Sequence, residues 1–470
     1  MRCVVCGAHK FLFAFKVAGQ HLLKCSGCGI LARSAPPQEA GPEHAVPERE
    51  ELEHLLRNEM ALRDVHGATA VVGVGSPLPD GSGTLMGMVL LDDVLCSEDP
   101  LAALAGLRSR LAEGGVLLFA CSPLDFGPLR LPLASWPSWR SARRFFMRRE
   151  HLHLLLLRAG FAQVWMSRQR IGSDLNRSAP AGRAPLLSRI ASATARMGLQ
   201  TGLMHYDRRK LATVLVSAAA ALPAPRPKLS IVMPVYNERA TFQQSLDAVL
   251  AKPLAGIDKE VIVVESRSTD GTAELVRACA GRPGVRLIFQ ERPRGKGNAV
   301  REGLAAASGS LVLIQDADLE YDVDDYDALL EPLLAHQAVF VLGSRHSGEW
   351  KMRSFIGQPL LSLFFNLGHL FFTAVLNALL RERMTDPFTM YKVFHRDALY
   401  GLEFVCNRFD FDHELVIKLV RKGYRPKEVG VNYVSRSYGE GKKVSVWRDA
   451  LTWIWTDLRL RLGALGPRPH

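Results

Sequence analysis

The stretch Leu-Val-Leu-Ile-Gln-Asp-Ala-Asp-Leu-Glu, residues 311–320, decides the fold of the second half of the chain. Its four apolar residues predict a buried strand, and its acidic residues begin where that strand ends. The carboxyl ends of strands in an open α/β sheet are where ligands bind. Asp316 and Asp318 can therefore hold Mg²⁺ or Mn²⁺ with positions left open for a diphosphate. The alternative is a solvated acidic turn.

Strands and helices alternate on both sides of this stretch. Strands are expected at 229–232, 259–264 and 285–289. Helices are expected at 241–250 and in a segment that opens within 292–298 and runs to residue 307. This alternation predicts an α/β domain with a parallel, doubly wound sheet.

Length and charge limit the remaining choices. A chain of 470 residues should form two or three domains. Its net charge of +12 is compatible with nucleic acid, anionic lipid or a phosphorylated substrate. We expect no nucleic acid partner, because no recognition helix is evident. The N-terminus lacks a run typical of a secretory signal, which indicates a cytoplasmic protein or one attached to the cytoplasmic face of a membrane.

Four cysteines near the N-terminus have metal-ligand spacing. Cys3, Cys6, Cys25 and Cys28 form two Cys-x-x-Cys pairs, each followed by glycine. Four thiolates at this spacing predict a closed, structural Zn²⁺ site in a ribbon over residues 1–33. Redox thiols or disulfides are the alternative. The other four cysteines are expected to be inert core residues.

Residues 34–217 contain motifs of a second domain. These are Asp92-Asp93-Val94, Asp99-Pro100, a turn and strand over 111–119, and a helix ending at Gly160-Phe161. In this order they resemble the second half of a class I S-adenosylmethionine-dependent methyltransferase, which implies a partial Rossmann-like fold.

The first half of that family's pattern is missing. Prolines follow Gly73-Val-Gly75, and too few residues precede the next strand to hold a second βα unit. We therefore expect a degenerate domain that no longer binds S-adenosylmethionine. An active methyltransferase, which would make the protein bifunctional, and a zinc-dependent binding module are the alternatives.

A linker rich in alanine and proline is expected at 218–228. Beyond it, four motifs occur in register: Pro-Val-Tyr-Asn-Glu (234–238), Ser-Thr-Asp-Gly-Thr (268–272), Arg-Gly-Lys-Gly (294–297) and Asp-Ala-Asp (316–318). They resemble a family 2 glycosyltransferase of the dolichyl- or polyprenyl-phosphate sugar synthase type. The resemblance covers about 228–448, with the catalytic domain at 229–443. It implies a GT-A fold, a nucleotide-diphosphate sugar donor and inversion at the anomeric carbon.

The resemblance also assigns donor-side roles. Arg294 and Lys296 would contact the diphosphate, helped by neighbouring glycines. Asp316 and Asp318 would hold the metal, with Glu320 in support, and the metal would neutralise the departing nucleotide. The nucleotide-sugar set is Pro234, Tyr236, Glu238, Glu265, Arg294, Lys296 and Asp316.

Acceptor-side roles follow from the later motifs. Arg345 and Arg353 would bind an acceptor phosphate, and Asp386 would be the nearest carboxylate. A phosphate monoester, with a second pKa of about 6, needs alignment more than a base. A hydroxyl acceptor would need a general base, for which Asp386, Asp412 or Glu414 are the candidates. Asp412 and Glu414 could instead cap a helix. A basic flap, or simple surface charge, is expected at Arg436, Lys442 and Lys443.

Two segments suggest a membrane surface. Residues 355–380 carry no Asp, Glu, Lys or Arg and are long enough to cross a bilayer, but polar residues interrupt them. We expect helices at the interface, as for the basic amphipathic segment 444–470. Core or dimer-interface helices in a homo-oligomer are the alternative. The function expected is sugar transfer to a polyprenyl phosphate on the cytoplasmic face, with a saccharide hydroxyl of a cell-surface polysaccharide as the other acceptor.

Overall fold

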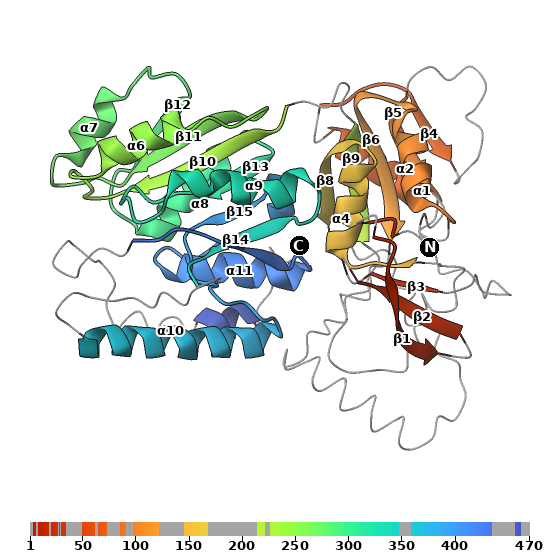
Figure 1. The fold of residues 1–470 in the computed structure, drawn as a ribbon. Helices are drawn as coiled ribbons and strands as arrows, with labels where there is room; N and C mark the ends of the chain where they lie inside the picture. Colours follow the sequence, from red (N-terminus) through yellow and green to blue (C-terminus); the bar gives the residue numbers. More distant parts are fainter. Residues whose placement is uncertain are drawn as a thin grey trace. The chain divides into compact units, whose positions relative to one another are not determined.

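The computed structural model describes part of the chain in detail and divides it into two compact units, Met1–Pro225 and Arg226–His470 (Figure 1). The described residues are 3–5, 8–17, 20–26, 28, 30–33, 49–61, 64–72, 85–90, 94, 97–121, 145–167, 214–220, 226–346, 359–434 and 456–461.

The second unit is built on a seven-stranded sheet with the order β12-β11-β10-β13-β15-β14-β16. Its strands are β10 (Lys228–Val235), β11 (Asp258–Glu265), β12 (Val285–Phe289), β13 (Leu311–Ile314), β14 (Phe340–Ser344), β15 (Lys392–His395) and β16 (Pro426–Gly430). The predicted central strand is confirmed, since β13 is buried along its whole length.

The sheet is mixed, so the prediction of a fully parallel sheet is wrong. Strands β12, β11, β10 and β13 are parallel, but β15 lies antiparallel between β13 and β14. A buried apolar strand has the same composition in either direction, and only its tertiary partners fix which way it runs.

Helices cover this sheet on both faces. They are α6 (Phe242–Ala251), α7 (Thr272–Ala278), α8 (Lys296–Ala306), α9 (Tyr326–Leu334), α10 (Pro359–Leu380) and α11 (Asp410–Lys422), with short 3₁₀ turns at Val323–Asp325 and Arg396–Leu399. Helix α8 packs closely on β10, because a Cβ on Gly303 would lie 2.4 Å from Val232 Cγ1. Helix α11 packs against α8 and α10 (Figure 1).

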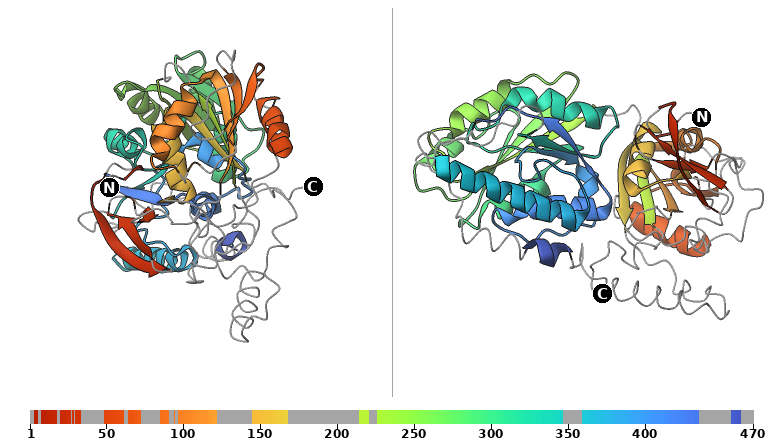
Figure 2. Two further views of the ribbon diagram at one scale, coloured as in Figure 1. Left: turned by 90° about the vertical axis from the view of Figure 1, so that its right-hand side faces the viewer. Right: turned by 60° about the horizontal axis from the view of Figure 1, so that its bottom comes forward.

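Helix α10 is the long helix that Figure 2 shows along the outside of this unit. Its described side chains include a buried stripe at Phe372, Leu376 and Leu380 and two exposed apolar side chains, Leu367 and Phe371. Within the described residues, no helix combines the length and the apolar character required to span a bilayer.

The described residues of the first unit form two sheets. A four-stranded sheet has the order β1-β2-β3-β7 and a five-stranded sheet the order β4-β5-β6-β9-β8. The strands are β1 (Phe11–Val17), β2 (Gln20–Cys25), β3 (Leu31–Arg33), β4 (Thr69–Val72), β5 (Leu85–Leu90), β6 (Leu111–Cys121), β7 (Phe145–Phe146), β8 (Phe161–Ser167) and β9 (Val214–Ala220). Helices are α1 (Arg49–Ala61), α2 (Pro100–Arg108) and α4 (Arg149–Arg158).

Local signals explain the boundaries of these elements. Asp99 caps α2, accepting hydrogen bonds from the amides of Leu101 and Ala102. Gly160, with a φ of 92°, follows α4 as predicted. Strand β9 continues to Ala220 and β10 begins at Lys228, so the connection between them is shorter than the linker predicted at 218–228. Strand β3 pairs with β7 across the boundary predicted at residue 33.

Candidate functional site

The carboxyl ends of β10 and β13 form the switch point of the seven-stranded sheet. From β10 the chain adds β11 and β12 on one side and then returns to add β13 on the other. In open α/β sheets, connections on the two sides of such a point cover opposite faces and leave a crevice at the strand ends. Segments 236–238 and 315–318 follow these two strands directly. The acidic motif therefore lies at the carboxyl-terminal end of β13, as the sequence predicted.

Lys296 lies against the acidic motif. Its Nζ donates a hydrogen bond of 2.6 Å to Asp316 Oδ2 and lies 3.0 Å from Met390 Sδ. Burial raises the pKa of Asp316 and Lys296 opposes that rise. Burial would lower the pKa of Lys296, but Asp316, Asp412 and Asp318 raise it above its usual value. The ammonium thus balances part of a carboxylate cluster.

The glycines around Lys296 serve packing. A Cβ on Gly295 would lie 2.4 Å from the carbonyl oxygen of Asn407, and one on Gly297 would lie 2.5 Å from Phe411 Cβ. The Asn298 amide donates to the Asn407 carbonyl at 3.1 Å. The sequence suggested that these glycines allow a diphosphate to approach, but here the close neighbour is segment 406–411.

Glu265 organises its own loop. Its carboxylate is 2% exposed and accepts hydrogen bonds from the amides of Arg267 at 2.9 Å and Ser268 at 2.6 Å. In this structure the carboxylate closes its own loop, and the expected nucleotide contact stays a prediction. A carboxylate that follows a strand fits both roles equally well in the sequence.

Segments 234–238 and 268–272 are joined by hydrogen bonds. The Asn237 side chain accepts from the Thr269 amide at 2.8 Å, and the Glu238 amide donates to Thr272 Oγ1 at 3.0 Å. Of the predicted nucleotide-sugar ligands, Tyr236 is 37% exposed, and Arg294 is exposed as well. Pro234, near the end of β10, is half-buried.

Arg345 and Asp386, predicted as an acceptor ligand and a base, bind each other. Arg345 Nε donates to Asp386 Oδ2 at 2.6 Å and its Nη2 to Oδ1 at 2.8 Å. Asp386 is fully buried. Burial would raise the pKa of this carboxyl, but the guanidinium outweighs burial and holds it well below its usual range. Asp386 is therefore a weak proton acceptor in this arrangement.

Tyr433, which the sequence analysis missed, connects the two clusters. Its hydroxyl donates to Glu320 Oε2 at 2.7 Å, and its ring lies 5.0 Å from the Arg345 guanidinium. Tyr433 follows β16, far along the chain from either partner, and nothing in the local sequence marks it. The acidic motif and the Arg345–Asp386 pair are thus one side chain apart.

Comparison with known proteins identifies the second unit. The model of glycosyl transferase family 2 matches residues 230–402. An uncharacterized glycosyltransferase of Mycobacterium tuberculosis is 31% identical over 229 residues, 48% of this chain and 94% of that protein. The chain belongs to glycosyltransferase family 2. It is therefore an enzyme of the glycosyltransferase class, in a mixed α/β fold with Rossmann-like sheets.

More distant relatives of this glycosyltransferase have named activities. The dolichol-phosphate mannosyltransferase of Pyrococcus furiosus is 25% identical over 215 residues, 46% of this chain and 59% of that protein. The structure of glucosyl-3-phosphoglycerate synthase from Mycobacterium tuberculosis, with Mn²⁺, uridine-diphosphate and phosphoglyceric acid, is 23% identical. The match covers 52% of this chain and 80% of that one, with a TM-score of 0.39.

The other two candidate bases of the glycosyltransferase are also held by donors. Asp412 Oδ1 accepts from Lys392 Nζ at 3.2 Å. Glu414 is fully buried and accepts from the amides of Val405 and Cys406 and from Lys418 Nζ. Helix α11 begins at Asp410, so both carboxylates lie inside the helix and the capping alternative is wrong.

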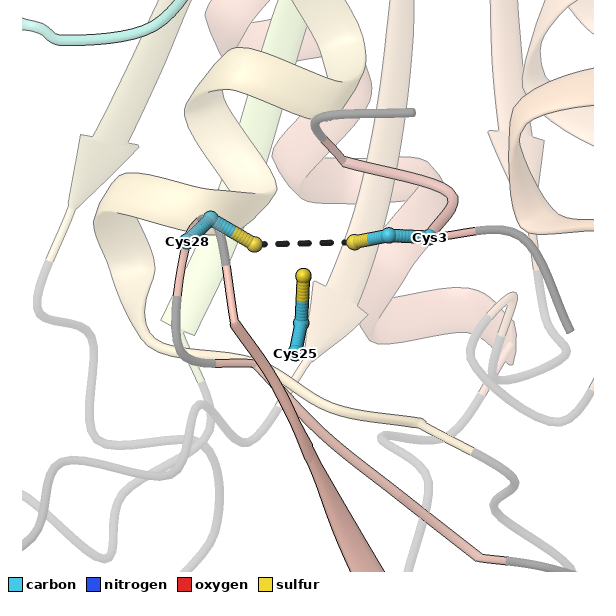
Figure 3. A group of neighbouring side chains, drawn as sticks. All are labelled: Cys3, Cys25 and Cys28. Carbon is cyan, nitrogen blue, oxygen red and sulfur yellow. Dashed lines mark hydrogen bonds between the residues drawn. The ribbon is translucent and has the colours of Figure 1, made fainter. Parts of the chain in front are cut away.

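Three of the four predicted zinc ligands of the ribbon are described. Cys3, Cys25 and Cys28 have sulfurs within 4.8 Å of one another, and Figure 3 shows the three side chains converging. Cys6 lies outside the described residues, as do Arg353, Arg436, Lys442 and Lys443.

Only a short part of the predicted C-terminal amphipathic segment is described, and it faces the protein. Asp457 Oδ1 lies 2.8 Å from His413 Nδ1, and Arg461 Nε donates to the carbonyl oxygen of Leu379 at 2.8 Å. Arg461 therefore helps to hold this segment to α10.

Proposed function

We propose that this glycosyltransferase has a GT-A fold, depends on a divalent metal, and transfers a sugar with inversion from a nucleotide-diphosphate donor to a phosphate acceptor such as polyprenyl phosphate. The observation that carries the choice of acceptor is the state of Asp386. A hydroxyl acceptor must lose its proton to a general base. Asp386 is paired with Arg345 through two hydrogen bonds, and Asp412 and Glu414 also accept from lysines.

A phosphate acceptor removes the need for a base. Its second pKa is about 6, so near neutrality most of it already carries a nucleophilic oxygen. What such an acceptor needs is positioning. Arg345, fixed by Asp386 on one side and by the Tyr433 ring on the other, is a cation with a defined direction. The identity of one relative as a dolichol-phosphate mannosyltransferase supports the same acceptor class.

On the donor side, the residues fit a hard divalent cation. Asp316, Asp318 and Glu320 offer only oxygen ligands, which Mg²⁺ and Mn²⁺ prefer. Burial is the largest effect that raises the pKa of Asp316; Lys296 opposes it, and the neighbouring carboxylates of Asp412 and Glu320 add to the rise. A bound cation would supply Lewis-acid stabilisation of the leaving diphosphate. Lys296, 2.6 Å from Asp316, would contribute a second positive charge to the same leaving group.

Product analysis with matched acceptors tests the proposal. The purified full chain is incubated with a panel of nucleotide-diphosphate sugars and Mn²⁺, with either polyprenyl phosphate or the corresponding polyprenol. We expect a glycosylated lipid phosphate and no product from the alcohol. A product formed only from unphosphorylated acceptors, including saccharides, would contradict the phosphate assignment and leave the family assignment intact.

We further propose that the enzyme works at a membrane surface. Leu367 is 56% and Phe371 57% exposed, one turn apart on α10, and such a pair suits insertion at an interface. In co-sedimentation with anionic liposomes, replacing both with Glu should reduce binding. Leu334→Glu, at an apolar residue of α9 that is 39% exposed, is the matched control. Equal binding by all three proteins would contradict this proposal.

For the first unit, we propose a structural zinc ribbon next to a degenerate methyltransferase-like domain. The convergence of Cys3, Cys25 and Cys28 supports the ribbon. The Cys25→Ser variant should lose zinc, measured as metal per chain, whereas Cys279→Ser, at a buried cysteine of the second unit, should retain it. Full zinc content in Cys25→Ser would contradict the ribbon.

A further inference from the structure

Two histidines lie beside the Arg345–Asp386 pair, and no role has been assigned to them above. They are His346 and His369, and their ligand atoms lie within 4.8 Å of each other and of an Asp386 oxygen. His369 Nε2 is 4.0 Å from Asp386 Oδ1, and the two imidazole rings are 4.7 Å apart. The three residues come from three different parts of the second unit: the turn after β14, helix α10 and the segment after α10.

Hydrogen bonds fix all three parts. The His346 amide donates to Ser344 Oγ at 3.2 Å, and that hydroxyl lies 2.7 Å from Thr385 Oγ1. The amides of Thr385 and Asp386 both donate to the Glu428 carboxylate of β16.

Helix α10 is joined to the same segment. The Asn377 side chain exchanges two hydrogen bonds with the backbone of Met384, at 2.7 and 2.8 Å. The cluster is thus held from both sides of Asp386, as a ligand site with low reorganisation cost requires.

We propose that His346, His369 and Asp386 form a second divalent-metal site, selective for borderline transition ions such as Co²⁺, Ni²⁺ or Zn²⁺. Two imidazoles and one carboxylate are a common three-ligand set that leaves a position open. A metal about 2.1 Å from each ligand puts tetrahedral ligand atoms roughly 3.4 Å apart. His369 Nε2 and Asp386 Oδ1 are 4.0 Å apart and all the ligand atoms lie within 4.8 Å of one another, so metal binding requires inward shifts of at most about 1.4 Å.

Arg345 determines which metals the site prefers. Asp386 Oδ2 accepts from both Nε and the backbone amide of Arg345, whereas Oδ1, the oxygen 4.0 Å from His369 Nε2, accepts from Nη2 and has a second lone pair for a metal. The guanidinium also cancels the negative charge that a hard ion such as Mg²⁺ needs. The imidazoles then supply most of the affinity, and imidazole favours borderline ions over Mg²⁺. This separates the site chemically from the all-oxygen motif at Asp316 and Asp318.

Cobalt titration of the full chain tests the site without any activity measurement. The parent protein carries Asp318→Ala, which weakens the oxygen site, and its zinc content is quantified first so that the ribbon metal is counted. The parent should bind one further Co²⁺ with visible d–d absorption. His346→Gln and His369→Gln should each weaken this binding by more than about 100-fold, since even outer-shell changes cost about 10–100-fold. His66→Gln, at a histidine 80% exposed in the first unit, should bind as the parent does.

A second measurement covers the case in which a variant folds poorly. On the parent protein itself, Co²⁺ should protect His346 and His369 from diethyl pyrocarbonate, mapped by mass spectrometry, while His66 stays reactive. Co²⁺ binding that is absent from the parent or equal in all variants would overturn the proposal. Protection by inorganic phosphate but not by Co²⁺ would also overturn it and would identify the cluster as an anion site.

Discussion

The two larger sheets of this protein differ in where their first strand lies. In the seven-stranded sheet, β10 has parallel neighbours on both sides, β11 and β13. In the five-stranded sheet, β4 pairs with β5 alone among the described residues, and each further strand is added on the same side. Among the described strands, only the first arrangement creates a switch point, and the candidate site lies there. We therefore expect a ligand site at the seven-stranded sheet and none at the five-stranded sheet.

The largest loss of stability is expected from breaking the buried Arg345–Asp386 ion pair of the second unit. Asp386→Asn leaves the Arg345 guanidinium, 7% exposed, without its counter-charge, which should cost about 3–5 kcal/mol of unfolding free energy. Asp247→Asn breaks a pair of the same 2.6 Å length, but its side chains are 36% and 48% exposed and the cost should be a small fraction of that. Equal losses in urea denaturation of the full chain would show that the Arg345 pair is not effectively buried.

A pair of glycine substitutions compares the two units directly. A Cβ on Gly297 would lie 2.5 Å from Phe411 Cβ, so Gly297→Ala should destabilise the protein by about 1–3 kcal/mol. Gly106 lies in α2 of the first unit, where an added Cβ would meet no described atom within 4 Å, and Gly106→Ala should stabilise by about 0.5–1 kcal/mol. Thermal unfolding of both variants gives the signs. Destabilisation by Gly106→Ala would mean that α2 has neighbours beyond the described residues.

Glu260, in the amino-terminal half of β11, should make a smaller, pH-dependent contribution to the free energy of unfolding. Burial would raise the pKa of Glu260, but Ser230, Lys228 and Ser308 lower it to about 2, from 4.5. A depressed pKa stabilises the fold above pH 4.5, and this contribution is lost as the pH falls toward 2. Because Glu260 is partly solvated, Glu260→Gln should cost about 1 kcal/mol at pH 7.

Urea denaturation across this pH range checks the sign. The difference between the wild type and Glu260→Gln should close below pH 4.5. Glu274→Gln, at a side chain 71% exposed, is the control and should differ little at any pH. A difference that persists at pH 2 would show that the Glu260 carboxylate does not act through its charge.

For S-adenosylmethionine we expect no binding at all. If β4 lacks a switch point, S-adenosylmethionine should give no saturable heat in calorimetric titration of the full chain. A nucleoside diphosphate with Mn²⁺ serves as the positive control, because it should bind at the carboxyl ends of β10 and β13. Saturable S-adenosylmethionine binding would show that both sheets carry a ligand site and would support an active methyltransferase in the first unit.

The sequence predicted the bounds of the strands well and the contacts between side chains poorly. Strands 285–289 and 311–314 have the predicted bounds, because local apolar runs and turn residues set them. The resemblance predicted that Lys296 and Asp316 act near the same diphosphate, and the structure adds a direct hydrogen bond between them. The Arg345–Asp386 pair was not predicted, since its members are 41 residues apart and each has a plausible separate role. The loop-closing Glu265 and the bridging Tyr433 likewise depend on tertiary geometry that no local pattern records.

Turnover of Asp318→Ala tests the central claim most directly, because that claim places a metal-assisted sugar transfer at the β10–β13 edge. With the donor and acceptor that the wild type uses and saturating Mn²⁺, kcat should fall by about 100-fold or more, which corresponds to a Lewis-acid contribution of several kcal/mol. Asp324→Ala, at a carboxylate 78% exposed in the same unit, should retain wild-type turnover. Wild-type turnover by Asp318→Ala would contradict the account.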